Sequence, residues 1–563
     1  MKLRTKIGFG LVAALGLFSS CETTELEGLL DNPNQLRPEQ INLASGIDGL
    51  QFQMNNVFRS TSAVAADATR LSWMFGTTYQ NAFSPGSGGG AWNAAYAGIL
   101  LDSNVIIPQL VELDAAYEEG MVRTIKAYAL MTLVDFWGDV PFDEAALGLE
   151  NFNPALTPGD QVYAAALAEL DLAIAAFDRD LDPDITTGSI VGGDIPLNLF
   201  FAGDDIGSQT NKSENWKKFA TTLQFKYHLN LGNVTELNAL IASGDLIEDI
   251  EDSVALQYGT STNPESRNPV YVAEYGDDTP GDYISNSLMY RMVDINDQYF
   301  GEDPRAAHYF YRQTTEFPTG ITNPSIGDAL PCFDDPSPYA PEFVFCAFDL
   351  TDDNPAAYWG RDHGDSGGIP PDNNLRSTYG SYPIGGNVDT GDGGGVGDGD
   401  GINGEGISPL LMAWQVDMMR AEAALRLGTA DLAANVLLQR AIEKSVSFVT
   451  AFDRDLATDD NGVAFASNVI ADFDAAGSVD DQLQILGTQF WISCYQSGNE
   501  FYNFYRRTGF PNNLQPHLQL GGAGDFPRSL FYVGGTANLN LSVQQKPDLN
   551  QSVFWADSSI PLN

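Results

Sequence analysis

Residues 410–443 read LLMAWQVDMMRAEAALRLGTADLAANVLLQRAIE, and this stretch predicts the fold of the chain. Apolar residues recur every three or four positions on both sides of a central Gly428-Thr429 pair, which is the pattern of two amphipathic helices. Gly428 is suited to end the first helix, and Thr429 is suited to cap the second. The first helix carries three small residues that permit close contact with its partner, namely Ala421, Ala423 and Ala424. The stretch therefore predicts two antiparallel helices joined by a short turn.

Helical periodicity recurs along most of the chain, whereas the alternation typical of strands is scarce. We expect helices over 38–59, 91–110, 113–136, 158–176, 213–231, 234–242, 282–296, 408–427, 430–447 and 480–495. Several of them form pairs that resemble tetratricopeptide units, although no strict consensus repeats along the chain. The predicted fold class is mainly α.

The first 21 residues have the layout of a bacterial lipoprotein signal. Lys2, Arg4 and Lys6 precede an apolar run over 7–18 that is short for a membrane-spanning helix, and two serines precede Cys21. Acyl chains on Cys21 would anchor the chain, because each buried CH₂ contributes about 0.8 kcal/mol. We expect a leader over 1–20, a flexible acidic tether over 21–34, and a ligand-binding domain over 35–563.

Two long insertions interrupt the helices of this domain, at about 254–281 and 318–406. They are rich in Gly, Pro, Asn, Asp and aromatic residues, so we expect ordered loops that cover a helical scaffold. Residues 390–406 (TGDGGGVGDGDGINGEG) offer oxygen ligands for a structural calcium ion, although Ile402 interrupts the EF-hand pattern. A solvated surface loop is the favoured interpretation, and the calcium candidates are Asp398, Asp400, Asn403 and Glu405.

The net charge of the 563-residue chain is −47, with 28 basic and 75 acidic residues. A field of this sign repels phosphate backbones, so nucleic acid is excluded as a partner. It also disfavours strongly anionic polymers unless arginines gather locally. Hydrophobic residues make up 43% of the chain, which is typical of a globular protein, and no apolar run after the leader is expected to span a membrane.

Cysteine and histidine are scarce, with four residues of each. An exported protein can join Cys332 to Cys346 across a Pro-rich loop, or leave both reduced, while Cys494 is expected to be a buried free thiol on a helical face. No histidine has the spacing of a zinc ligand. The string Gly364-Asp365-Ser366-Gly367-Gly368 is the one that surrounds a serine protease nucleophile, but a mostly helical chain cannot supply the two barrels of that fold. We expect residues 361–365 to be a polar turn that ties down a loop.

Aromatic residues within the loops, which we expect to be exposed, are the more useful signal, because sugar rings present apolar C–H faces that stack on flat rings. One group lies early in the chain and a second in the long insertion: Trp73, Phe75, Tyr79, Trp92 and Tyr96, then Tyr358, Trp359, Tyr379 and Tyr382. Any single aromatic residue is more often part of the core. As a set within loops they indicate a binding surface.

Several blocks of the sequence resemble the SusD/RagB family of outer-membrane lipoproteins, and they occur in the same order as in that family. They are DNPN (31–34), AYAL with LVDFWGDVPF (127–142), WKKFATTL (216–223), AEAALRLG (421–428), QFWI (489–492), Glu500 with RRTGFP (506–511), and FPR (526–528). Phe490 departs from the usual Lys of the family, and Tyr532-Val533 departs from a common Tyr-Pro pair. The blocks look like scaffold, with Arg506 and Arg507 anchoring helix ends and loop carboxylates, and Trp137 and Trp491 in the core.

The resemblance implies four tetratricopeptide-like helix pairs packed against a loop-rich half that binds ligand. It implies a protein without catalytic activity or cofactor, lipid-anchored at the outer membrane and facing the cell exterior. Such a protein captures oligosaccharides as the lid of a SusC-like TonB-dependent transporter. Sugar platforms of the family commonly fall between the first and second helix blocks and in the long central insertions. The predicted ligand-binding residues are therefore Trp73, Tyr79, Trp92, Asn93, Tyr358, Trp359 and Arg361.

Three functions remain open at this stage. The acidic field favours a neutral glycan, such as a β-glucan, as the ligand. The RagB side of the family would instead import peptides. A surface glycoside hydrolase would need two carboxylates about 5–10 Å apart, and no motif supports one.

Overall fold

In the computed structural model, the stretch that opened the prediction forms a strand followed by a helix pair. Strand β6 covers Ile407–Leu411, α16 covers Ala413–Leu427 and α17 covers Ala434–Thr450. Gly428 ends α16 in the left-handed conformation with a φ of 68°, as predicted. Two details of the prediction are wrong. The segment 408–411 is a strand rather than helix, and α17 begins after Ala433, so Thr429 does not cap it.

The structure describes residues 42–145, 151–190, 196–201, 209–276, 282–293, 303–314, 358, 360–366, 376–456, 462–518 and 522–562. Several sequence-based predictions lie outside these residues: the leader and tether with Cys21, the Cys332–Cys346 pair, Trp359 and much of the insertion expected at 318–406.

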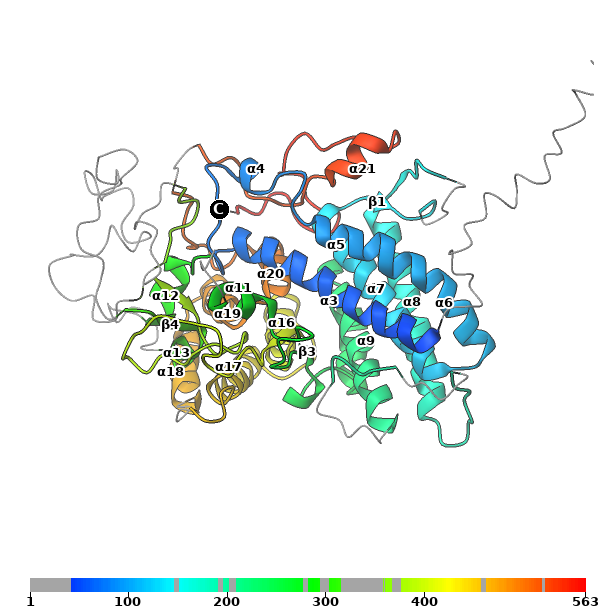
Figure 1. Ribbon diagram of the computed structural model, residues 1–563, viewed down its shortest axis with the longest axis horizontal. Coiled ribbons are helices and arrows are strands. Elements are labelled where there is room, and N and C mark those ends of the chain that lie inside the picture. Colours follow the sequence, from blue (N-terminus) through cyan, green and yellow to red (C-terminus); the bar gives the residue numbers. More distant parts are fainter. Residues whose placement is uncertain are drawn as a thin grey trace, which may run out of the picture.

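The described chain contains four helix pairs, as the family resemblance implied, and the fold class is mainly α. They are α7 with α8 (Ala116–Trp137, Gly159–Leu181), α9 with α10 (Gln209–Leu231, Val234–Ser243), α16 with α17, and α18 with α19 (Gly462–Ala475, Val479–Ser493). Helix α18 is missing from the set of helices that the sequence predicted. In Figure 1, α7, α8 and α9 lie at one end of the molecule and α16 to α19 at the other.

Helix α3, Leu43–Ala68, joins the two ends and runs through the middle of the molecule (Figure 1). It packs against α7 and against α20, Gly498–Thr508. The sequence of α20 is rich in Phe, Tyr and Arg. The helix continues beyond the predicted end at Arg59 because the polar residues that follow bond within the fold. Thr61 Oγ1 donates to the Val57 carbonyl over 2.8 Å, and Ser62 Oγ donates to the Gln496 carbonyl over 3.3 Å.

The predicted helix over 91–110 is built from three consecutive segments, α5 (Gly89–Asn93), the π-helix η2 (Ala94–Leu100) and α6 (Leu101–Glu112). The sequence predicted no membrane-spanning segment after the leader. By length and composition alone, however, Gly89–Glu112 is long and apolar enough to cross a membrane. Half of its most apolar window is buried inside the molecule, and it packs on α3 and α7. These contacts are those of a core helix.

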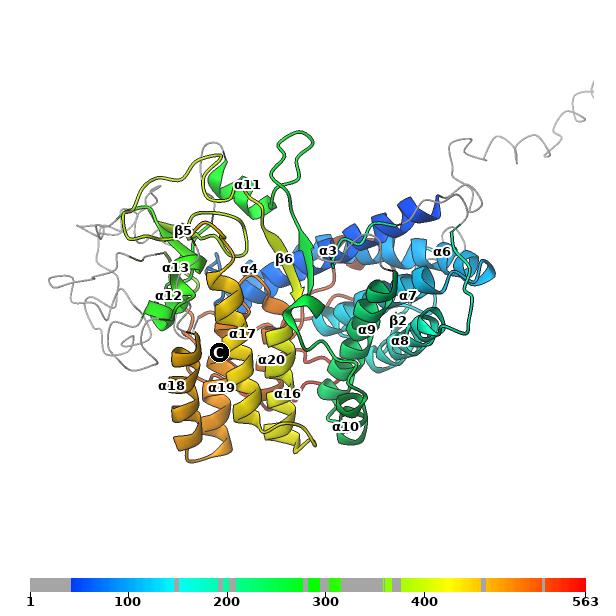
Figure 2. The same ribbon diagram turned by 90° about the horizontal axis from the view of Figure 1, so that it is seen from below.

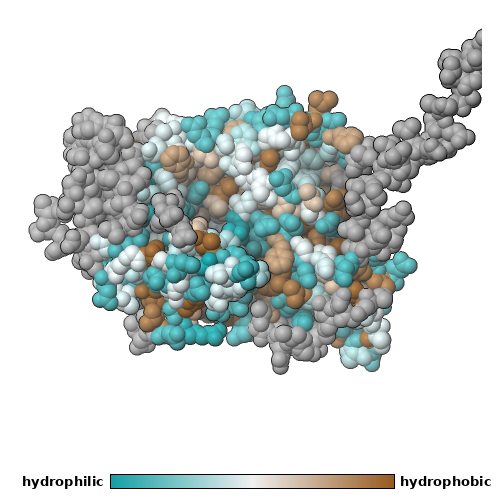
Figure 3. Space-filling model, viewed as in Figure 1, coloured by the Kyte–Doolittle hydropathy of each residue, from teal (hydrophilic) through white to brown (hydrophobic). Residues whose placement is uncertain are grey.

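The other regular elements of the described chain are short strands and short helices. Three antiparallel two-stranded sheets pair β1 with β2 (Val140–Pro141, Leu156–Thr157), β3 with β6 (Val254–Gln257), and β4 with β5 (Phe310–Arg312, Ser377–Tyr379). The remaining helices are α4 (Tyr79–Ala82), η4 (Ile250–Asp252), α11 (Pro269–Tyr275), α12 (Asn286–Val293), α13 (Ala306–Tyr309) and α21 (Gly534–Leu539). Leu539, at the end of α21, and Leu541 are strongly exposed. Figure 3 shows hydrophobic surface along the upper edge of the molecule.

The sequence blocks that the structure describes meet in the core, where they serve the scaffold as predicted; DNPN (31–34) lies outside the described residues. Arg507 pairs with Glu422 of α16 at 2.6 Å, and Arg506 donates to the backbone carbonyl of Asp135 at the end of α7 over 2.7 Å. Burial opposes the ionisation of Glu422, but Arg507 and Arg426 hold its pKa below the usual value. Trp137 and Trp491 are fully buried in one continuous hydrophobic cluster, and Cys494 is a buried free thiol.

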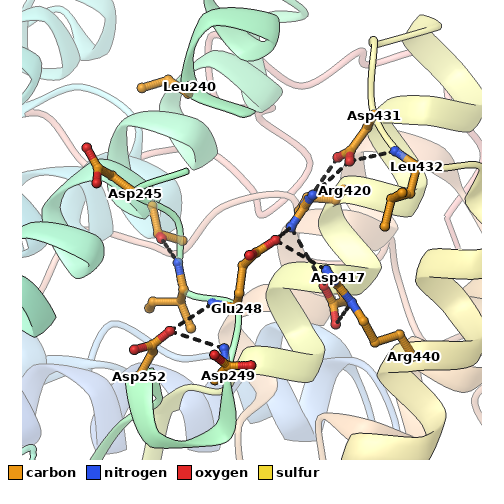
Figure 4. Close-up of polar contacts among 12 residues, drawn as sticks. Leu240, Asp245, Glu248, Asp249, Asp252, Asp417, Arg420, Asp431, Leu432 and Arg440 are labelled. Atoms are coloured by element: carbon orange, nitrogen blue, oxygen red, sulfur yellow. Dashed lines mark hydrogen bonds and ion pairs between the residues drawn. The ribbon is translucent and has the colours of Figure 1, made fainter. Parts of the chain in front are cut away.

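A polar network fastens the segment after α10 to the α16–α17 pair (Figure 4). The Arg420 guanidinium donates to both carboxylate oxygens of Asp431, at 2.8 and 2.7 Å, and to Glu248 at 2.5 Å. Asp417, whose side chain is fully buried, accepts from Arg440 Nε at 2.9 Å and from Lys444 Nζ at 2.7 Å. These pairs join two parts of the scaffold that lie far apart in sequence.

The helix pairs and the loops occupy opposite sides of α3. In Figure 2, α10 and α16 to α19 extend to one side, while α11 and the loops near β5 extend to the other. The scaffold therefore presents loop residues along one face of α3.

Candidate binding site

A cavity of about 470 Å³ lies where α3 meets the loops and strands of this face. This volume is within the range of small-molecule binding sites. Its walls combine aromatic rings with carboxyl, amide, hydroxyl and guanidinium groups. The side chains that matter most for chemistry are Phe58, Arg59, Asp67, Ser72, Trp73, Phe75, Asn268, Asp282, Tyr379, Ser408 and Gln496.

Trp73 and Phe75 form the aromatic part of this cavity. Their ring centroids are 5.5 Å apart and their planes cross at 72°, so the two rings offer surfaces in different directions. Phe75 is 64% exposed, and Trp73 is half-buried. An aromatic ring with an open face in a polar cavity suits a ligand with flat apolar patches surrounded by hydrogen-bonding groups.

The loop at 360–366 contacts and supports the Trp73 ring. Its indole Nε1 donates to the Asp365 carbonyl over 3.1 Å, and the Arg361 guanidinium lies 5.3 Å from the ring centroid. The same guanidinium lies 4.2 Å from the ring of Tyr283, which meets Trp73 edge-on at 5.3 Å. Arg361 is only 2% exposed, so it contributes to the support of Trp73 and presents little surface to a ligand.

The loop that carries Arg361 is the polar turn that the sequence predicted. Asp362 accepts hydrogen bonds from Asn286 at 3.2 Å and from Gln515 at 2.8 Å. Gln515 in turn accepts from the backbone N–H of His363 at 2.9 Å. These bonds tie the loop to α12 and to the segment after α20, which fixes the position of Trp73.

Two carboxyl groups face the cavity beside the aromatic pair. Burial, opposed by a hydrogen bond from Ser72 at 2.5 Å and reinforced by the charge of Asp282, raises the pKa of Asp67 to about 8. Burial also raises the pKa of Asp282, which accepts from the Tyr379 hydroxyl over 2.7 Å. At neutral pH, Asp67 is therefore mostly protonated, and its neutral carboxyl can donate as well as accept a hydrogen bond.

Tyr79 does not line this cavity, and the expectation that its ring is exposed is wrong. The ring is 3% exposed, and its hydroxyl accepts from Arg70 Nη2 at 2.9 Å. The hydroxyl also lies 3.1 Å from Nε2 of His363. These contacts explain its burial: the ring completes a polar cluster beneath the loops and leaves no face for a ligand.

Trp92 is likewise buried, at 5% exposure, because Trp137 meets its ring edge-on at 5.3 Å and Tyr96 packs at 4.8 Å. It reaches a separate pocket of about 300 Å³, whose wall includes the exposed ring of Phe152. Asn93 is exposed and lines a third hollow on the other face of the same helical segment. The predicted early group is therefore divided among three places.

Of the predicted residues in the long insertion, Tyr358 is half-buried and lies away from Trp73. Its ring packs under the Arg312 guanidinium at 4.7 Å, and Arg312 pairs with Asp389 at 2.6 Å. This arrangement is that of a loop support.

The four calcium candidates do not converge on one point. Arg267 pairs with Asp398, Asp400 accepts from the backbone N–H of Gly397 at 2.8 Å, and Asn403 donates to the Thr260 carbonyl at 3.3 Å. Glu405 is exposed. Among the described residues, no group of three or more His, Cys, Asp or Glu side chains is arranged to hold a metal ion. The described part of the run is instead held by Arg267 and by backbone hydrogen bonds.

Sequence reasoning missed the charged residues of the cavity, namely Arg59, Asp67 and Asp282. Two of them, Arg59 and Asp67, lie on α3, whose other charged residue is Asp48. Nothing local pointed to Asp282, which reaches the cavity only through the folding of a distant loop.

The fold and cavity define a class: an α-helical binding protein whose site lies on a loop-rich face. The chain matches the SusD-like family described as "Starch-binding associating with outer membrane", over residues 49–328 and 325–525. The match covers most of the chain, so the protein belongs to the SusD-like family, a family of outer-membrane-associated binding proteins rather than enzymes. No curated protein sequence matches it.

Solved structures show the same fold at low sequence identity. A SusD/RagB family protein from Bacteroides thetaiotaomicron is 16% identical, with a TM-score of 0.60, over 92% of this chain and 99% of its own. A SusD homolog from Bacteroides fragilis is 17% identical, with a TM-score of 0.60, over the same shares. A chitin-binding SusD homolog from Flavobacterium johnsoniae is 18% identical, with a TM-score of 0.57, over 90% of this chain and 98% of its own.

Proposed function

We propose that this protein captures a neutral oligosaccharide at the outer membrane, and that the cavity around Trp73 and Phe75 is its binding site. The observation that carries the proposal is the exposed aromatic pair beside hydrogen-bonding groups in one cavity. A pyranose ring combines an apolar face with a rim of hydroxyls, and this cavity offers a partner for each. The family description and the chitin-binding relative support a glycan as the ligand class.

A neutral glycan such as a β-glucan fits the electrostatics better than an anionic one. The net charge of −47 repels polyanions, and among the described residues Arg59 is the only cationic side chain that lines the cavity. Asp67, protonated at neutral pH, adds a hydrogen-bond donor without adding charge. Starch and chitin fragments are neutral as well, so the ligand panel must include all three series.

The proposal extends to the setting of the site. A lipid anchor at Cys21 would hold the domain at the outer face of the outer membrane, and a SusC-like TonB-dependent transporter would receive the ligand from it. The test of the anchor is Cys21→Ala in the full chain, which should move the protein from the membrane fraction to the soluble fraction. Co-purification of a TonB-dependent barrel with the wild-type protein tests the partner.

The binding test is calorimetric titration of the chain without residues 1–21. The ligands are malto-, chito- and laminari-oligosaccharides, alginate oligosaccharides and a peptide mixture. Phe75→Ala is expected to weaken glycan binding by about 1–3 kcal/mol, by analogy with base stacking on aromatic side chains. Phe152→Ala removes another exposed ring from a different pocket and should leave binding unchanged.

The outcomes separate the candidate ligands. Saturable binding of a neutral series that Phe75→Ala weakens supports the proposal. Binding of peptides alone would replace it with the peptide-import function of RagB-type proteins. Equal loss in the Phe75 and Phe152 variants would show that this cavity is not the site.

A further inference from the structure

A second hollow of about 590 Å³ lies on the adjacent face of α3. One wall is α3, and the other is the helical segment that runs from α5 through η2 into α6. The lining residues are Gln53, Asn56, Arg59, Ser60, Gly90, Asn93, Ala94, Ala97, Gly98 and Asp102. We call this hollow the α3–η2 groove.

The lining of the α3–η2 groove has a different chemistry from the first cavity. Among the described residues, no aromatic or branched aliphatic side chain lines it, and its apolar lining consists of glycines and alanines. Amide, hydroxyl, carboxyl and guanidinium groups complete the lining. The amides of Asn56 and Asn93 belong to exposed residues. Such a surface binds a hydroxyl-rich ligand through hydrogen bonds and offers no stacking contact.

The backbone under the groove is unusual. Residues Ala94–Leu100 form the only π-helical segment among the described residues. π-Helical turns are rare and occur frequently at functional sites. The glycines also make the close approach of the two walls possible, because a Cβ on Gly98 would lie 2.8 Å from Cγ of Gln53, and one on Gly90 would lie 3.1 Å from Oγ of Ser60.

Arg59 connects the groove to the cavity that holds Trp73. It lines both hollows and, among the residues that the structure describes, is the only cationic side chain in either. Within the part of the chain that the structure describes, it forms no ion pair or side-chain hydrogen bond. An arginine has five N–H donors, so Arg59 has its full capacity available to a ligand that crosses between the two hollows.

We propose that the α3–η2 groove is a second subsite that binds the continuation of the same glycan chain. One or more sugar units stack on Trp73 and Phe75, the chain passes over Arg59, and the next units hydrogen-bond to Asn56, Asn93 and their neighbours. The ligand is then an extended oligosaccharide rather than a mono- or disaccharide. This inference rests on the proposed function, since it uses the first cavity as the stacking subsite.

The test is a ladder of oligosaccharides of increasing length, from the disaccharide upward, in the malto-, chito- and laminari- series. Binding is measured by calorimetry for the wild-type chain, Ala97→Phe and Asn93→Ala. Ala97 is exposed on η2, so a phenylalanine there fills the groove from the outside. Ala164→Phe is the matched control, because Ala164 is exposed on α8 and lines neither hollow.

For the wild type, affinity should rise with chain length until both hollows are filled. Ala97→Phe should weaken the longest ligands about tenfold and leave the shortest unchanged, since it removes one or two net hydrogen bonds. Asn93→Ala should weaken long ligands in the same direction, and Ala164→Phe should have no effect.

Failure of the inference can be told apart from failure of the proposed function. If the wild type binds short and long ligands equally, or if the groove variants bind long ligands as well as the wild type, the groove is not a subsite while the glycan site stands. If no series binds at any length, both the subsite and the proposed function fall.

Discussion

Asp67 allows a sharp test of the electrostatics of the cavity. Shielding from water raises the pKa of its carboxyl from 3.8 to about 8, and the charge of Asp282 adds to the increase. Asp67→Asn replaces the protonated carboxyl with a neutral group of similar shape. Ser72 can still donate to the amide oxygen, so the variant keeps the hydrogen bond observed in the cavity.

The sign of the effect follows from proton binding. Between about pH 4 and pH 8 the folded chain retains a proton that the unfolded chain has released, so the free energy of unfolding falls as the pH rises. Each unit of difference between the folded and unfolded pKa corresponds to about 1.4 kcal/mol. The loss in the free energy of unfolding at pH 8 and above therefore has an upper limit of about 6 kcal/mol. Because Asp67 is only half-buried, we expect about half of this, on the order of 3 kcal/mol.

The assay is urea unfolding of the chain without residues 1–21, followed by tryptophan fluorescence at several pH values from 4.5 to 8.5. Asp67→Asn should match the wild type at the acid end and become progressively more stable than it toward the alkaline end. Asp472→Asn is the control, because Asp472 is exposed on α18 and should change stability by less than about 0.5 kcal/mol at any pH. A difference between Asp67→Asn and the wild type that does not vary with pH would refute the reasoning.

Two further substitutions test the scaffold by the same unfolding assay. Asp417→Asn should lower the free energy of unfolding by about 3 kcal/mol, because it removes the buried carboxylate that Arg440 contacts; a loss no larger than that of Asp472→Asn would mean that the network in Figure 4 contributes little. Gly364→Ala should cost about 2–4 kcal/mol, since Gly364 has a φ of 78° and a Cβ there would lie 2.3 Å from the His517 ring. Near-wild-type stability of Gly364→Ala would show that the loop under Trp73 shifts easily.

The helical scaffold was predictable because its signals are local. Apolar periodicity located the four pairs except for α18, and the left-handed position after α16 required a glycine, which stands at Gly428. The strand β6 was missed because its apolar residues continue directly into those of α16. What makes Ile407–Leu411 a strand is its pairing with β3, whose partner residues lie some 150 positions earlier in the chain.

The candidate site was predictable only as a region. Trp73 was correctly expected near other aromatic rings, but its supports, Tyr283 and the Asp365 carbonyl, come from segments far along the chain. Tyr79 and Trp92, like Trp73, have small and polar neighbours in the sequence, yet both rings are buried. Whether a ring is exposed depends on which distant residues cover it, as His363 covers Tyr79. The sequence near each ring carries no sign of such contacts.

The protonated state of Asp67 also bears on ligand choice. The chain as a whole carries a large negative charge, and a cavity with two ionised carboxylates beside Arg59 would attract a cationic ligand. Asp67 keeps its proton up to about pH 8, so at neutral pH its carboxyl is a hydrogen-bond donor and the Asp282 carboxyl is an acceptor. Beside the two aromatic rings lies the guanidinium of Arg59, which pairs with no other residue of the described chain. Those groups match the hydroxyls and C–H faces of an uncharged sugar. Binding of a neutral glycan should therefore weaken as the pH rises through 8, when Asp67 loses the proton that it can donate.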